Sequence, residues 1–193
     1  MSNSQFATTL PPDISPRTRI IAVLCVDQFT ADPCEDGWFV SDFSDFLSLF
    51  GDAAPASRQT WMHCVDFKEL IEKHKWYLHG NPYKKRKVVL DKVIYAKWEK
   101  HLDEGKVSKT GMKLTFQNKL KEEVLKVADL ETEGHLLVLL FGHGSKKGGS
   151  KFLFPADKTD IQIAWAPTAF MRALKFAKGL KVTMLSTACY SGG

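Results

Sequence analysis

The stretch His135-Leu-Leu-Val-Leu-Leu-Phe-Gly-His143-Gly-Ser145 decides the fold of this 193-residue chain. A short, continuous apolar run of this kind is typical of a strand buried on both faces of a parallel sheet. The run ends at a glycine and is followed by a histidine. A second stretch, Val182-Thr-Met-Leu-Ser-Thr-Ala-Cys189-Tyr-Ser-Gly-Gly193, ends in the same way with a cysteine in a turn of small residues. We therefore expect two strands whose ends carry a base and a nucleophile.

Two more strand-like runs lie upstream, the β-branched Arg19–Val26 and the weaker Thr60–Asp66. Between the strands, hydrophobic residues recur at helical spacing. Helices are expected over residues 39–50, 67–78, 90–105, 113–129 and 167–179. This alternation predicts an α/β fold with three layers, in which helices cover both faces of a mostly parallel sheet of at least four strands in the order 2-1-3-4.

Length and composition predict one soluble domain. Residues 1–16 are polar and carry three prolines, so they are expected to form a flexible tail before a domain at 17–193. The net charge of +5 is too small for a dedicated nucleic-acid binder. The start lacks a secretory pattern, and the longest apolar run, Leu136–Phe141, is too short to span a bilayer. We expect a cytoplasmic or nuclear protein without a membrane partner.

The two motifs together indicate nucleophilic catalysis, because the predicted strand order brings the carboxyl ends of their strands side by side. A cysteine thiol titrates near 8.5 and needs a neighbouring base to become a nucleophile at neutral pH. His143 can accept that proton and later return it to a leaving amine. The backbone N–H groups of Gly144 and Cys189 are the expected donors to an oxyanion.

These residues also carry a resemblance. Phe141-Gly-His143-Gly144 resembles the histidine motif of caspase-like cysteine peptidases, the group that contains caspases, metacaspases and legumain-type enzymes. Thr187-Ala-Cys189-Tyr-Ser-Gly-Gly193 resembles their nucleophile motif. The distance in sequence between the histidine and the cysteine is also close to the roughly 50 residues that separate them in caspases. The resemblance implies a caspase-like fold and an endopeptidase that acts on polypeptides through a thioester acyl-enzyme. Cys189 would be the nucleophile, His143 the general acid and base, and Gly144 part of the oxyanion hole.

The sequence departs from the family pattern directly before the cysteine and again after it. Thr187 and Ala188 stand where metacaspases often carry an acidic residue, which leaves the preferred substrate side chain open. The loop Asp27–Asp36 is where such enzymes often place a residue that recognises the substrate, and its acidity favours a basic side chain before the scissile bond. Family members also carry a further helix and strands after the cysteine, so we expect a catalytic domain that is incomplete at its C-terminus, with an uncovered strand edge that favours self-association.

Spacing alone identifies no third catalytic residue. The acidic residues near predicted strand ends are Asp27, Asp66 and Asp157. Two alternative functions stay open: a non-catalytic caspase-fold interaction module or inactive fragment, and a nucleotide-binding α/β domain that would use the glycine- and lysine-rich Gly142–Gly149. The second alternative lacks the spacing of a phosphate-binding loop.

The remaining polar clusters predict little chemistry. Lys84–Lys87 fits a nuclear-import signal, a phosphate-binding patch or a solvated loop. His63 with Cys64, and Cys34 with Asp36, lack the second pair that structural zinc requires, so neither a metal nor a cofactor is expected. The four cysteines show no CxxC pair and are expected to be free thiols.

Overall fold

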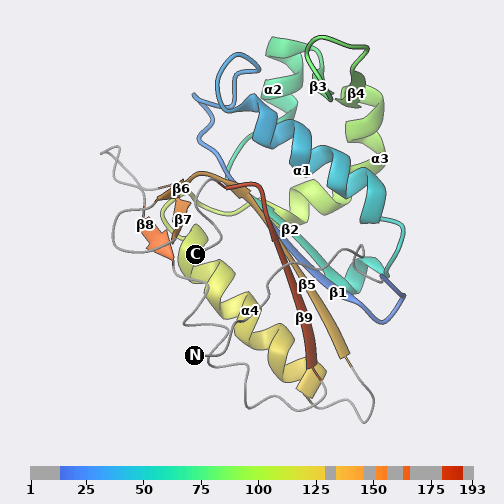
Figure 1. Cartoon of the computed structure of the whole chain (residues 1–193), viewed down its shortest axis with the longest axis vertical. Helices are drawn as coiled ribbons and strands as arrows, with labels where there is room; N and C mark the ends of the chain where they lie inside the picture. The colour runs from blue at the N-terminus through green and yellow to red at the C-terminus, as the bar shows by residue number, and fades with distance from the viewer. Residues whose placement is uncertain (1–13, 129–133, 146–150, 156–162, 166–179, 189–193) are drawn as a thin grey trace.

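The computed structural model describes residues 14–128, 134–145, 151–155, 163–165 and 180–188. Its centre is a four-stranded sheet (Figure 1). The strands are β1 (Arg19–Cys25), β2 (Gln59–His63), β5 (Gly134–Gly142) and β9 (Leu180–Ser186). They lie in the order β2-β1-β5-β9, and all three neighbouring pairs are parallel. The predicted α/β class, the parallel sheet and the order of its four strands are confirmed.

Helices cover both faces of this sheet, which gives three layers (Figure 1). On one face lie α1 (Gly37–Phe50), α2 (Phe67–His74) and α3 (Lys92–Gly105), and on the other lies α4 (Met112–Ala128). Alternate residues of β1 supply the two cores, because successive side chains of a strand point to opposite faces. Ile20, Ala22 and Leu24 face α1 to α3, whereas Ile21, Val23 and Cys25 face α4. The helix predicted over 167–179 lies outside the described residues.

The predicted helix over residues 67–78 is wrong in its second half. α2 ends at His74, because Lys75 adopts a positive φ of 68° that ends the helical path. The chain then forms β3 (Tyr77–His79), which pairs antiparallel with β4 (Lys87–Leu90). Tyr77 is buried, and its hydroxyl donates a 2.7 Å hydrogen bond to the carbonyl oxygen of Ala31. This long-range contact and the strand pairing override the local helical pattern.

A second, antiparallel sheet follows β5 directly. It consists of β6 (Gly144–Ser145), β7 (Lys151–Phe154) and β8 (Ile163–Trp165) in that order. β7 pairs antiparallel with both β6 and β8. Phe152 and Phe154 are buried against the α4 side of the central sheet. The turn after β5 is therefore anchored in the core rather than extended into solvent.

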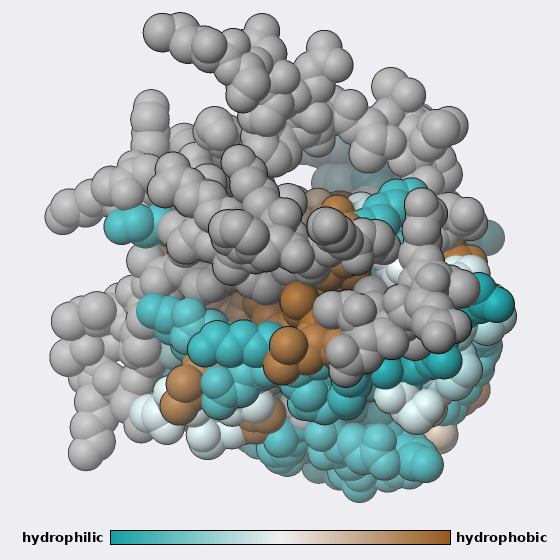
Figure 2. Space-filling model, turned by 90° about the horizontal axis from the view of Figure 1, so that it is seen from below, coloured by the Kyte–Doolittle hydropathy of each residue, from teal (hydrophilic) through white to brown (hydrophobic). Residues whose placement is uncertain are grey.

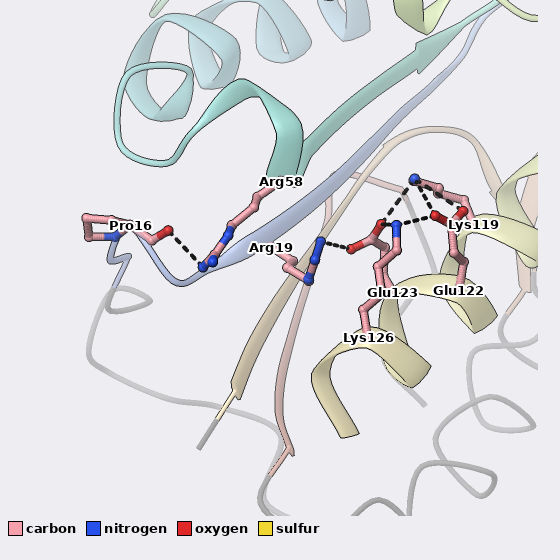
Figure 3. Close-up of polar contacts among 7 residues, drawn as sticks. All are labelled: Pro16, Arg19, Arg58, Lys119, Glu122, Glu123 and Lys126. Atoms are coloured by element: carbon pink, nitrogen blue, oxygen red, sulfur yellow. Dashed lines mark hydrogen bonds and ion pairs between the residues drawn. The ribbon is translucent and has the colours of Figure 1, made fainter. Parts of the chain in front are cut away.

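An ion cluster ties α4 to the central sheet (Figure 3). Nη1 of Arg19, on β1, lies 2.5 Å from Oε2 of Glu123, whose side chain is only 4% exposed. Lys119 and Lys126 approach Glu123 at 3.1 and 3.3 Å and also pair with the outer Glu122. Because Glu123 is buried, its ion pairs with the three basic side chains compensate for the hydration that the carboxylate loses on folding.

Seen from below, the described part of the surface is mixed, with hydrophobic side chains near the centre of the view and hydrophilic ones along its lower border (Figure 2). No helix among the described residues combines the length and apolar character needed to cross a membrane. β9 is the terminal strand of the central sheet within the described residues. Self-association through that edge, the N-terminal tail and the domain bounds stay predictions.

Candidate active site

His143 directly follows β5 at the carboxyl edge of the central sheet. Its carbonyl oxygen accepts a 3.0 Å hydrogen bond from the N–H of Leu153 on β7. This bond fixes the backbone at the turn. The imidazole itself is 40% exposed, so the ring remains accessible to solvent although its backbone is fixed.

The first turn of α1 contacts the imidazole from two directions. Nε2 of His143 lies 2.8 Å from Oδ1 of Asp36, and the ring of Phe39 meets the imidazole edge-on at a centroid distance of 5.0 Å. With a proton on Nε2 donated to the carboxylate, the lone pair of neutral His143 resides on Nδ1. Nδ1 is therefore the ring nitrogen that can accept a proton from another group.

The loop between β1 and α1 holds Asp36 in place through its own backbone bonds. The N–H of Asp36 donates to the carbonyl of Thr30, and the N–H of Ala31 donates to Asp27, both at 2.9 Å. Gly37 follows Asp36, and a Cβ atom there would lie 2.6 Å from the carbonyl oxygen of Asp32. A glycine is thus required beside Asp36 for the loop to close in this form.

The strand that precedes Cys189 reaches the same edge of the sheet as His143. β9 pairs with β5 through Ser186, and the N–H of Thr187 extends the pairing with a 3.0 Å bond to the carbonyl of Leu140. Ala188 is buried against the α4 side of the sheet. Cys189 is next in the sequence and lies outside the described residues, as does its predicted contact with His143.

Gly144, the predicted oxyanion donor, lies opposite Phe152 in the β6–β7 pairing. The bond from Leu153 N–H to His143 O joins residues that flank this pair, which marks Gly144 and Phe152 as a non-hydrogen-bonded pair. The N–H of Gly144 consequently points away from β7. This geometry leaves the donor for another acceptor.

The other cysteines differ in their suitability as nucleophiles. Burial, and then the neighbouring Cys64, raise the pKa of the Cys25 thiol well above its ordinary value. Burial, and then the charge of Asp27, raise the pKa of Cys64 to about 11. Both thiols are protonated at neutral pH and unreactive. Cys34 is exposed in the loop between β1 and α1.

The acidic residues considered from sequence have other partners. Asp27 pairs with Lys109, and Asp66 caps α2 through the N–H of Glu69 and pairs with Lys106 at 2.7 Å. Asp157 lies outside the described residues. Asp36 is the carboxylate that reaches His143, and the sequence reasoning missed it in this role. The predicted strand order could have pointed to Asp36, since it places the loop after β1 beside the end of β5.

His63 has a structural role. It is buried, its Nδ1 lies 2.9 Å from the carbonyl oxygen of Val65, and its Nε2 lies 2.7 Å from that of Leu102. Burial foremost lowers the pKa of this imidazole. Within the described ranges, no group of three or more His, Cys, Asp and Glu side chains gathers as a metal site would require.

The structure adds no support for a phosphate-binding role of the glycine- and lysine-rich segment or of the basic cluster Lys84–Lys87. Residues 146–149, the second half of Gly142–Gly149, lie outside the described residues. Lys84–Lys87 is exposed at the connection between β3 and β4, where Lys87 pairs with Asp45 at 2.8 Å. The four basic residues therefore do not belong to the group formed by His143, Asp36 and Phe39.

No family model, no curated protein and no solved structure matches this chain. The chain combines an α/β sheet, a histidine held by Asp36 and Phe39 at the end of β5, and a cysteine motif in the sequence after the neighbouring β9.

Proposed function

We propose that this chain is a caspase-like cysteine endopeptidase that hydrolyses peptide bonds through Cys189 and His143. The observation that carries the proposal is the parallel pairing of β5 with β9. It continues to the bond between Thr187 and Leu140, two residues before Cys189 and three before His143. The resemblance of the two motifs to caspase-like peptidases supports the same function.

The proposed reaction begins with proton transfer from the Cys189 thiol to Nδ1 of His143. The thiolate attacks the carbonyl carbon of the scissile bond, and the resulting oxyanion accepts hydrogen bonds from the N–H groups of Gly144 and Cys189. His143 then gives its proton to the leaving amine as the C–N bond breaks. A water molecule, deprotonated by His143, hydrolyses the thioester and releases the acid product and the thiol.

The substrate is a polypeptide, and the side chain preferred directly before the scissile bond is left unassigned. The acidity of the loop 27–36 favours a basic residue before the scissile bond. However, Asp27 pairs with Lys109, Asp32 accepts the N–H of Cys34, and Asp36 accepts from His143. A panel of probes with basic, acidic and apolar side chains at this position is therefore the appropriate test of preference.

Labelling with peptidyl acyloxymethyl ketones, read by peptide mass mapping, tests the function. We expect a probe of the panel to modify Cys189, and His143→Ala to slow that modification by about 100-fold, the usual contribution of a general base. Cys34→Ser and Cys64→Ser are matched controls: both should label at Cys189 as the wild type does.

The alternative interaction module predicts a different pattern. A folded chain that shows no modification of Cys189, or modification that His143→Ala leaves unchanged, would contradict the peptidase. Label that shifts to the exposed Cys34 would indicate ordinary thiol reactivity in place of an activated nucleophile.

A further inference from the structure

We infer that Asp36 is a positioning residue that holds His143 in the orientation and tautomer needed to activate Cys189. The inference rests on the proposed function and adds a third member to its site. The resemblance and the spacing identified only the cysteine and the histidine.

The carboxylate of Asp36 does not cap the helix that it precedes. Asp36 occupies the N-cap position of α1, where an aspartate normally accepts a hydrogen bond from a backbone N–H of the first turn. Here its side chain makes no such bond, whereas Asp66 and Asp91 cap α2 and α3 in the ordinary way. The carboxylate of Asp36 is directed instead to Nε2 of His143 at 2.8 Å. The carboxylate of Asp36 thus contacts the imidazole in place of capping α1.

Backbone hydrogen bonds fix both residues of the contact between Asp36 and His143. The backbone of Asp36 is fixed by its bond to Thr30, and the backbone of His143 is fixed by Leu153. Phe39, one turn along α1, packs its ring against the imidazole. The imidazole therefore has a defined position although its side chain is 40% exposed.

The contact at Nε2 also determines which nitrogen of His143 can act as a base. A carboxylate that accepts from Nε2–H selects the tautomer with its lone pair on Nδ1 and stabilises the imidazolium that forms when Nδ1 takes up a proton. In the described part of the chain, Nδ1 of His143 has no hydrogen-bond partner. This is the arrangement that a nucleophile–base–carboxylate site requires.

Alkylation of Cys189 by iodoacetamide isolates this role, since the reagent has no side chain for a specificity pocket to recognise. We expect Asp36→Asn and Asp36→Ser to lower the second-order rate by about tenfold, less than His143→Ala does. Serine lacks the carboxylate but is a favourable N-cap residue, so the second variant removes the contact with His143 without weakening the start of α1. Asp42→Asn is the matched control, because it removes a second pair between α1 and a histidine, Asp42 with His79 at 3.0 Å, and should leave the rate unchanged.

A double-mutant cycle distinguishes positioning from a general structural effect. If Asp36 acts through His143, Asp36→Asn should cause no further loss in the His143→Ala background. An additional loss there, or an Asp36→Asn rate equal to that of the wild type while His143→Ala is slow, would overturn the inference and leave the proposed function intact. Equal rates for the wild type and His143→Ala would overturn both.

Inactivation kinetics with a lysine-bearing acyloxymethyl ketone distinguish a positioning role of Asp36 from a role in recognising the substrate side chain. A positioning residue predicts that Asp36→Asn lowers the maximal inactivation rate and leaves the inhibitor's half-saturating concentration unchanged. The reverse result would assign Asp36 to recognition of the substrate side chain and contradict the inference.

Discussion

Gly142 and Cys25 are register partners at the carboxyl ends of β5 and β1, and their backbones approach closely. A Cβ atom on Gly142 would lie 3.0 Å from Cβ and 3.1 Å from the carbonyl oxygen of Cys25, and 3.2 Å from the ring of Phe152. The residue before His143 must therefore lack a side chain for β5 to lie this close to β1.

Gly142→Ala should destabilise the fold and displace His143. We expect the free energy of unfolding to fall by about 1–3 kcal/mol, the usual cost of overpacking, and the labelling of Cys189 to slow. Urea denaturation and probe labelling measure the two effects. Gly80→Ala is the control: Gly80 also has a positive φ, but its nearest neighbours are 3.9 Å away, so a loss of stability there should not affect labelling.

Two threonines of the β9 segment should respond oppositely to replacement by valine. Oγ1 of Thr183 contacts Nε2 of His135 at 3.0 Å, so Thr183→Val should cost about 1 kcal/mol. Oγ1 of Thr187 is buried without a hydrogen-bond partner in the structure described, so Thr187→Val should be neutral or stabilising. Urea denaturation of both variants provides the comparison. Equal losses of stability would contradict the hydrogen-bond assignments.

Glu123 should be far more sensitive than its neighbour Glu122. Glu123→Gln leaves the largely buried guanidinium of Arg19 without its carboxylate, and we expect a loss of about 3 kcal/mol. Glu122, whose side chain is 47% exposed, pairs with the same two lysines, and Glu122→Gln should cost less than about 0.5 kcal/mol. The difference in thermal unfolding between these matched variants measures the effect of burial. A similar cost for both would show that the cluster acts only at the surface.

Asp27 should contribute to stability above its native pKa and lose that contribution in acid. Burial alone would raise the pKa of this carboxyl, but the hydrogen bond from Lys109 and that from the N–H of Phe29 lower it overall. A folded-state pKa below the unfolded one stabilises the protein at neutral pH, and the contribution is lost as pH falls below about 4. We expect Asp27→Asn to be less stable than the wild type at pH 7, with the difference shrinking in acid. Urea denaturation from pH 7 to pH 3 tests this, and a constant difference would contradict it.

The two central strands of the sheet, β1 and β5, followed from the sequence because they are buried on both faces. β1 and β5 consist of nearly unbroken apolar runs, and the helices between strands carry their hydrophobic residues on one side. The hairpin of β3 and β4 escaped prediction, because Leu78 fits a helical period as well as a strand. The left-handed Lys75 and the hydroxyl bond of Tyr77 decide that segment, and neither leaves a periodic signal.

By itself, the sequence determined the α/β class, the order of the four sheet strands and the motifs that carry His143 and Cys189. The class and the motifs depend on periodicity and on residue types at strand ends, which are local properties of the chain, and the strand order follows from the right-handed crossovers of doubly wound sheets. Only the tertiary structure decided that Asp36 faces His143, although 107 positions separate them. The physical reason is that β1 and β5 are neighbours, so the start of α1 lies beside the histidine turn, and a loop carboxylate acquires a partner that its own neighbourhood in sequence does not reveal.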